Sequence, residues 1–205
     1  MVVAALTLAA CSATPQQGKK DTASSGKSST VKVADWTCGD GTLHWGKVTT
    51  EGKLVAVSQL VRATKDKQQG NVTYQANPVR DVTAHIDASA KVSDETVIAS
   101  LTKKLGLDGQ RLARSGESVP VPKGTGFMTA DMKGKTGDYL ALLGVQVVEA
   151  SFVLGCAANS DKPVYGTVTT WYGKSQGMIK CGRDAGTYPG AREAHDLLCG
   201  EEPQA

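Results

Sequence analysis

The sequence predicts an α+β fold, in which an antiparallel sheet carries a central helix at about residues 93–105 and a short helix at about residues 191–198. Three observations predict this class. Short runs that alternate between apolar and polar residues are separated by turn signals, as in antiparallel strands. One segment has the caps and the apolar stripe of a helix. Strands and helices do not alternate regularly, as they do in parallel sheets. An all-β sandwich is the alternative.

The strands are expected where alternation and β-branched residues coincide. Glu51-Gly52-Lys53 is a hairpin-turn signal between the first two, Asn77-Pro78 breaks the next two, and residues 159–163 turn the chain before the last. The strongest core signal covers residues 139–156, where every second residue from Val148 to Cys156 is apolar. The expected segments are 43–49, 54–62, 72–76, 79–87, 139–156 and 164–172.

The central helix is predicted from its ends and from its stripe. Ser93 is the N-cap candidate, lysines occupy the last turn and Gly106 ends the segment, as the capping and dipole preferences require. The C-terminal helix is expected to be held in place by Cys199.

The N-terminal stretch predicts where in the cell the protein is located. Residues 1–10 hold no charged residue and end in Leu8-Ala9-Ala10, followed by Cys11. This run is too short to span a bilayer and fits the apolar part of a signal peptide. The four residues resemble the lipobox of bacterial lipoproteins at every position. The resemblance implies a diacylglycerol on the Cys11 sulfur, cleavage before Cys11, and anchoring at the extracytoplasmic face of the cell membrane.

Three segments are expected from this resemblance and from composition. Residues 1–10 are a signal peptide, residues 11–32 a lipidated Cys with a polar linker, and residues 33–205 one extracytoplasmic domain. The linker is too polar to order itself by burial. No Lys or Arg precedes Cys11, so we expect the true start upstream of Met1. High Ala, Gly, Thr and Val content favours an actinobacterial source.

The net charge of +3 belongs to the linker. Residues 12–32 hold four lysines and one aspartate, which leaves 19 basic and 19 acidic residues in the rest of the chain. Lysines near a bilayer are attracted to anionic headgroups. The rest of the chain has no net charge and therefore lacks the excess of basic residues that is typical of a nucleic-acid binder. We expect the membrane, and not nucleic acid, as a partner.

The cysteine count is odd, and lipidation of Cys11 explains it. The other four cysteines form an even set in an oxidising compartment, which predicts two disulfides among three possible connectivities. The short loop favours Cys181 with Cys199 and leaves Cys38 with Cys156. Their wide spacing does not favour a metal site, and we expect neither metal nor cofactor.

No catalytic motif is complete. The phosphate-loop, penicillin-binding and Gly-x-Ser-x-Gly patterns each lack a required residue. His44, His85 and His195 are far apart in sequence. An ordinary surface or edge role is expected of His44 and His85, and His195 lies near Asp196 in the short C-terminal helix. Exposed aromatic residues on a sheet often contact ligands, so Trp45, Trp171 and Tyr172 are the candidate ligand contacts. We therefore predict a binding or interaction domain for an unknown protein or carbohydrate ligand. A small hydrolase with an unrecognised site is the alternative.

Overall fold

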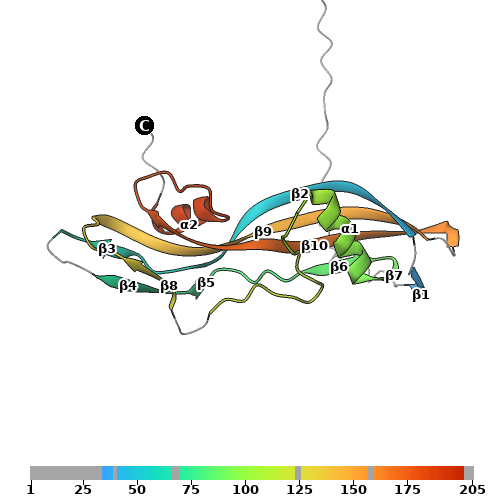
Figure 1. The fold of residues 1–205 in the computed structure, drawn as a ribbon, viewed down its shortest axis with the longest axis horizontal. Coiled ribbons are helices and arrows are strands. Elements are labelled where there is room, and N and C mark those ends of the chain that lie inside the picture. Colours follow the sequence, from blue (N-terminus) through green and yellow to red (C-terminus); the bar gives the residue numbers. More distant parts are fainter. Residues whose placement is uncertain (1–33, 39–40, 66–69, 123–125, 157–158, 201–205) are drawn as a thin grey trace, which may run out of the picture. The chain divides into compact units, whose positions relative to one another are not determined.

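Three long strands dominate the fold. The computed structural model describes residues 34–38, 41–65, 70–122, 126–156 and 159–200, all within the compact unit Lys32–Ala205. β2 (Gly41–Val57), β9 (Gly137–Cys156) and β10 (Asn159–Lys180) run side by side (Figure 1). All pairings in this sheet are antiparallel.

Shorter strands complete this sheet and form two small ones. In the main sheet the strand order is β5-β2-β9-β10-β6, and β3 pairs with β9 off this path. β4 pairs antiparallel with β8, and β1 pairs parallel with β7. The bounds are β1 Ala34–Cys38, β3 Val61–Ala63, β4 Asn71–Gln75, β5 Asn77–Pro78, β6 His85–Ala88, β7 Ala90–Val92 and β8 Gly126–Asp131.

The expected hairpin at Glu51-Gly52-Lys53 is wrong. Residues 41–57 form one strand that pairs with β9 along its length, with irregularities between Trp45 and Val48 and between Leu54 and Ala56. The local turn signal is overridden because a partner strand of twenty residues satisfies this backbone. The turn expected over residues 159–163 is also wrong, because β10 already begins at Asn159. The strand expected over residues 79–87 is reduced to β6.

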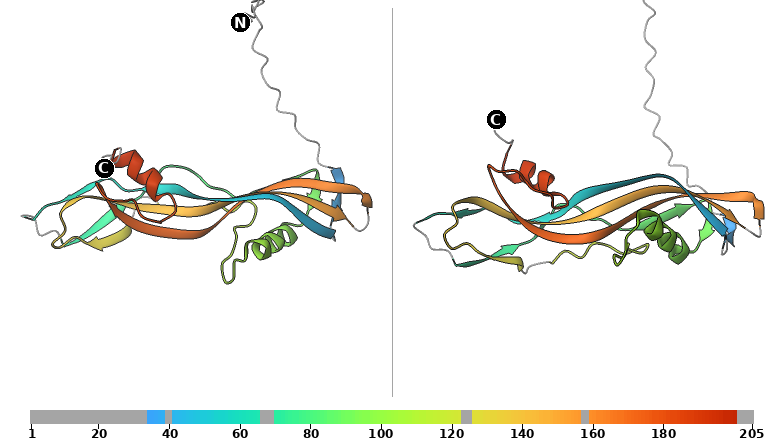
Figure 2. Two further views of the ribbon diagram at one scale, coloured as in Figure 1. Left: turned by 90° about the horizontal axis from the view of Figure 1, so that it is seen from above. Right: turned by 45° about the horizontal axis from the view of Figure 1, so that its top comes forward.

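The alternation of β9 divides the core into three hydrophobic clusters. The first gathers even-numbered residues of the second half of β9, including Val148 and Phe152, around α1 (Asp94–Leu105). The second gathers odd-numbered residues of the first half, such as Leu143, with β4 and β8. The third gathers Leu140 and Leu142 with α2 (Ala191–Leu198). Figure 2 shows the two helices over different lengths of the strands.

Both helices lie where the sequence predicts them. The Ser93 side chain accepts a hydrogen bond from Thr96 N, and Gly106 ends α1 in the left-handed conformation with φ of 63°. An N-cap of this kind contributes about 1 kcal/mol. The fold is mostly antiparallel sheet with two helices, which fits the α+β expectation loosely because the sheet dominates. No helix in the described ranges is long and apolar enough to cross a membrane.

The disulfide expected between Cys181 and Cys199 is confirmed, with a Cα–Cα distance of 5.2 Å. Cys156 is disulfide-bonded as well. Its pairing with Cys38 stays a prediction, because the side chain of Cys38 lies outside the described residues.

Candidate functional site

A disulfide-closed segment forms one wall of the candidate site. The Cys181–Cys199 bond spans 18 residues of sequence, and these residues include α2 and the loop before it. Ala185, Ala191 and Ala194 are buried in the third cluster, against side chains of β2, β9 and β10. The segment is therefore attached to the sheet both covalently and by apolar packing.

Glycines on three neighbouring strands let this segment lie close to the sheet. A Cβ added at Gly144 of β9 would lie 1.9 Å from Pro189 O, and one at Gly52 of β2 would lie 2.9 Å from Pro189 Cα. A Cβ at Gly177 of β10 would lie 2.7 Å from the Tyr188 ring. Because these positions carry no side chain, residues 188–190 can lie directly on the sheet.

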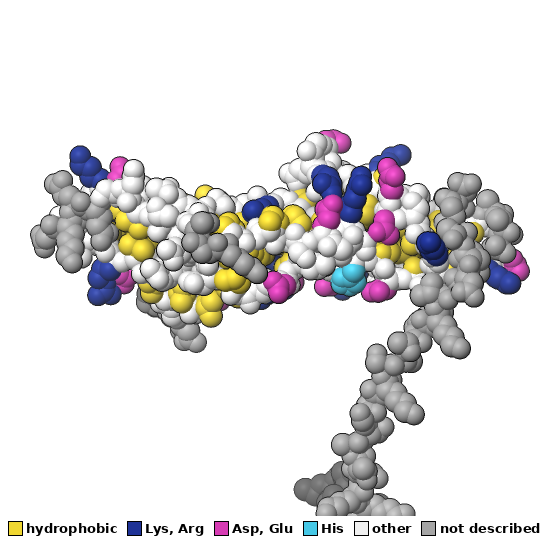
Figure 3. Space-filling model, turned by 90° about the horizontal axis from the view of Figure 1, so that it is seen from below, with side chains coloured by type: hydrophobic (Ala, Val, Ile, Leu, Met, Phe, Trp, Pro, Cys, Tyr) yellow, Lys and Arg dark blue, Asp and Glu magenta, His cyan; other side chains and the backbone are white. Residues whose placement is uncertain are grey.

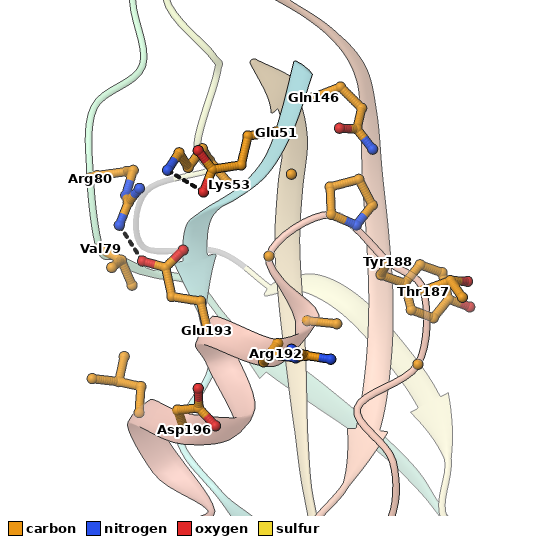
Figure 4. Close-up of a pocket in the computed structure, with 16 residues that line it drawn as sticks. Glu51, Lys53, Val79, Arg80, Gln146, Thr187, Tyr188, Arg192, Glu193 and Asp196 are labelled. Atoms are coloured by element: carbon orange, nitrogen blue, oxygen red, sulfur yellow. Dashed lines mark hydrogen bonds and ion pairs between the residues drawn. The ribbon is translucent and has the colours of Figure 1, made fainter. Parts of the chain in front are cut away.

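A cavity of about 840 Å³ opens beside this segment (Figure 4). Its volume lies within the ordinary range for ligand pockets. Four parts of the chain line it: β2, the segment after β5, β9 and the disulfide-closed segment. The lining residues are Glu51, Gly52, Lys53, Val79, Arg80, Gln146, residues 186–193, Asp196 and Leu197.

The charged groups of the cavity are arranged largely in pairs. Lys53 Nζ lies 2.6 Å from Glu51 Oε1, and Arg80 pairs with Glu193 of α2. Glu193 also accepts a hydrogen bond from Leu54 N at 3.1 Å, which ties α2 to β2. The lining holds three basic and three acidic side chains in all, so its formal charge is balanced.

The rim of the cavity is unusually apolar for this surface. Five large hydrophobic side chains are exposed in the described part of the chain, and three of them, Val79, Tyr188 and Leu197, line the cavity. Exposed apolar groups gathered in one concave place are typical of a binding site. On the face drawn in Figure 3, acidic and basic side chains are interspersed.

The aromatic residues predicted as ligand contacts are partly buried and pack against two of the hydrophobic clusters. Trp45 belongs to the first cluster, packs edge-on against Phe152 and donates its indole N–H to Ser100 Oγ at 3.1 Å. Trp171 belongs to the second cluster and donates to Glu117 O at 3.1 Å. Tyr172 is half-buried against the first cluster. Packing accounts for most of the surface of these residues, and none of the three lines the cavity.

The three histidines lie on three different elements of the fold. His44 is exposed on β2. His85 is exposed on β6, with Nε2 3.6 Å from Asp87 Oδ2. His195 is 2% exposed within α2, and its Nδ1 lies 3.9 Å from Asp196 Oδ1. Within the described ranges, no group of three or more His, Cys, Asp and Glu residues is placed to hold a metal ion.

Sequence reasoning missed the cavity, although it found the disulfide that frames it. One signal was present: Thr187-Tyr188-Pro189-Gly190 puts an aromatic residue in a Pro-Gly turn between two paired cysteines. The lipidation site Cys11 lies outside the described residues. Comparison of the chain with protein-family models, with curated proteins and with solved structures gave no match.

Proposed function

We propose that this chain is an extracytoplasmic lipoprotein, anchored to the cell membrane through Cys11, whose domain binds a ligand in the cavity beside α2. The observation that carries the binding role is the cavity itself, walled by a disulfide-closed segment and rimmed by exposed apolar side chains. The anchor is supported by the lipobox resemblance at residues 8–11 and by the polar stretch after it.

Binding is favoured over hydrolysis because two of the three acidic side chains of the cavity, Glu51 and Glu193, are engaged by neighbouring groups. A general acid or base must be able to reach a proton of the substrate. Glu51 is paired with Lys53, and Glu193 is occupied by Arg80 and by the backbone of Leu54. Glu193 thereby ties α2 to β2 and to the segment after β5, which suits a rigid binding site.

The anchor is tested by cell fractionation. Cys11→Ser removes the sulfur that would carry the lipid, so the variant is expected to leave the membrane fraction. Ser12→Ala is the matched control, because it changes the neighbouring residue and keeps the thiol. Retention of Cys11→Ser in the membrane at the wild-type level would contradict the anchor.

The binding role is tested by a ligand screen read out by thermal stabilisation of the full-length Cys11→Ser chain. Leu197→Ser in the same background removes an apolar group of the rim, whereas Leu60→Ser removes another exposed leucine, which does not line the cavity. Compounds that bind the cavity lose their stabilising effect with Leu197→Ser and keep it with Leu60→Ser. A set of hits that stabilises both variants equally would place binding elsewhere.

A further inference from the structure

β2 is an edge strand over most of its length. Its residues from Gly41 to Leu54 pair with β9 on one side, and pairing with β5 on the other side is confined to Ala56 and Val57. Among the described residues, no strand pairs with the outer edge of residues 41–54. Such an edge presents backbone N–H and C=O groups that can accept another strand.

The structure indicates which backbone groups face outward. Leu54 N donates to Glu193 of α2 and therefore points away from β9. Outward groups alternate along an antiparallel strand, so the N–H and C=O of Gly52 and Thr50 face the open side too. Nearer the end of β2 the edge is covered, because Val55 O accepts from both Val79 N and Arg80 N.

The open edge borders the cavity. Residues 51–53 of β2 line it on one side and α2 lines it on the other, with Glu193 bridging the two at Leu54. A groove between an edge strand and a helix has the parts that strand addition needs. The edge supplies main-chain hydrogen bonds, and the facing wall supplies contacts for every second side chain.

We propose that this groove binds an extended peptide, which adds to β2 as an antiparallel or parallel strand opposite Thr50 and Gly52. The inference rests on the proposed function, since it uses the same cavity. The balanced charge of the lining favours a segment without a strong net charge. Val79, Tyr188 and Leu197 favour apolar residues at alternate positions of the peptide.

The edge favours a short peptide over a second copy of this chain. Register is broken between Trp45 and Val48, and this break contains the exposed Lys47. Bulges and edge lysines oppose continuous pairing of two long edges. The regular register runs from Val48 to Leu54, and Glu193 already occupies the N–H of Leu54. The open part from Val48 to Gly52 has a length of roughly 17 Å at the usual strand rise, which suits a partner of about five residues.

The test uses a phage-displayed library of random octapeptides, selected on the full-length chain carrying Cys11→Ser. Selected peptides are synthesised, and their dissociation constants are measured by fluorescence polarisation. Each is then remade with single N-methyl groups along its backbone. Strand addition predicts that methylation of alternate amides, those facing β2, weakens binding roughly tenfold or more, because a hydrogen bond is lost and the methyl blocks the approach. Methylation of the intervening amides changes affinity much less.

Two further measurements locate the peptide. Amide hydrogen exchange at Thr50 and Gly52 slows on binding if the peptide pairs with this edge. Thr50→Pro removes the outward N–H while leaving the pairing with β9 intact, because Pro is tolerated where the N–H faces solvent, and it is expected to weaken binding roughly tenfold. Thr50→Val keeps the N–H and is expected to weaken it less than about threefold.

The outcomes separate this inference from the proposed function. Peptides that bind in a Leu197-dependent way, without the alternating N-methyl pattern and without slower exchange at Thr50 and Gly52, overturn strand addition and leave the cavity as the site. Binding of a second copy, seen as dimerisation that Thr50→Pro abolishes, also overturns the peptide assignment. A selection that yields no peptide, with small-molecule hits that require Leu197, refutes the peptide and supports the cavity. Failure of every ligand to depend on Leu197 refutes both.

Discussion

Gly144 supports the wall of the proposed site, and substituting it tests how that wall is built. This residue is buried on β9, under the loop before α2. In Gly144→Ala the new Cβ would lie 1.9 Å from Pro189 O, 2.7 Å from Pro189 C and 3.2 Å from Lys53 O. All three neighbours are backbone atoms, so no side chain can rotate away. Residues 188–190 must therefore lift from the sheet.

The magnitude follows from the cost of overpacking. Extra carbon atoms in a tightly packed site destabilise by about 1–3 kcal/mol, which lowers Tm by roughly 2–12 °C for a chain of this size. Because the Cys181–Cys199 bond keeps the segment attached, part of the effect is expected as local loosening. Amide exchange in residues 186–197 should then accelerate more than exchange in β9.

Gly155→Ala provides the matched control, on the same strand. Its added Cβ would meet Thr42 O at 4.0 Å, an ordinary contact. Replacing a strand glycine by alanine at an open position stabilises by about 0.5–1 kcal/mol. Thermal denaturation followed by circular dichroism should therefore show a lower Tm for Gly144→Ala and an unchanged or higher Tm for Gly155→Ala. If Gly144→Ala and Gly155→Ala have equal Tm values and equal amide exchange in residues 186–197, Gly144 is not the residue on which this loop packs.

Three other predictions follow from the described contacts. The double variant Cys181→Ser/Cys199→Ser should lose about 3 kcal/mol in the free energy of unfolding, because the closed loop no longer restricts the unfolded chain; urea denaturation measures this, and a loss under 1 kcal/mol would contradict it. Trp45→Phe removes the bond to Ser100 and should cost about 1 kcal/mol, whereas a destabilisation that Ser100→Ala does not share would show that this bond is not the cause. Burial raises the pKa of Tyr74, so its contribution to stability is complete below the unfolded-state pKa and is lost as the pH rises through the folded-state value. Denaturation between pH 9 and 12 should show a smaller alkaline loss for Tyr74→Phe, and an equal loss in both proteins would rule this out.

Local signals were enough to predict the helices. Ser93 and Gly106 define the ends of α1 by side-chain and backbone preferences that act within one turn. The Cys181–Cys199 bond was predictable for a similar reason, since these two cysteines are the nearest pair in sequence. Features that depend on neighbours within a few residues could be read from the sequence.

Gly52 shows why the sheet was harder to predict. Between two charged residues it is typical of a turn, yet it lies inside β2 and pairs with Gln146. Its lack of a side chain is used for the close approach of Pro189, which is far away in sequence. A glycine required by a long-range contact has the same sequence signal as a glycine required by a turn, so the strand boundary could not be predicted locally.

The cavity was unpredictable for the same physical reason. Glu193 reaches Leu54 across 139 positions of sequence and Arg80 across 113. Neither pair has any spacing that a helix or strand period would reveal. Tyr188, the exposed aromatic residue of the cavity, lies in a loop, whereas Trp45 and Trp171 lie in strands and are partly buried against the hydrophobic clusters.

The outer edge of β2 is blocked against unwanted strand pairing at two places, and this supports the groove as a peptide-binding site. An unpaired edge invites unwanted pairing unless it is blunted. The irregularity around Gly46 and Lys47 interrupts the first half of this edge, and Glu193 occupies the outward N–H of Leu54 in the second half. Between the irregularity and Leu54, the outward backbone groups of Thr50 and Gly52 stay open. They lie beside the disulfide-closed segment, which packs against glycines of the sheet. The edge of β2 is thus blocked at two places and open between them, next to the apolar rim of the cavity. This arrangement is expected of a strand that pairs with a short peptide and does not pair with a long strand.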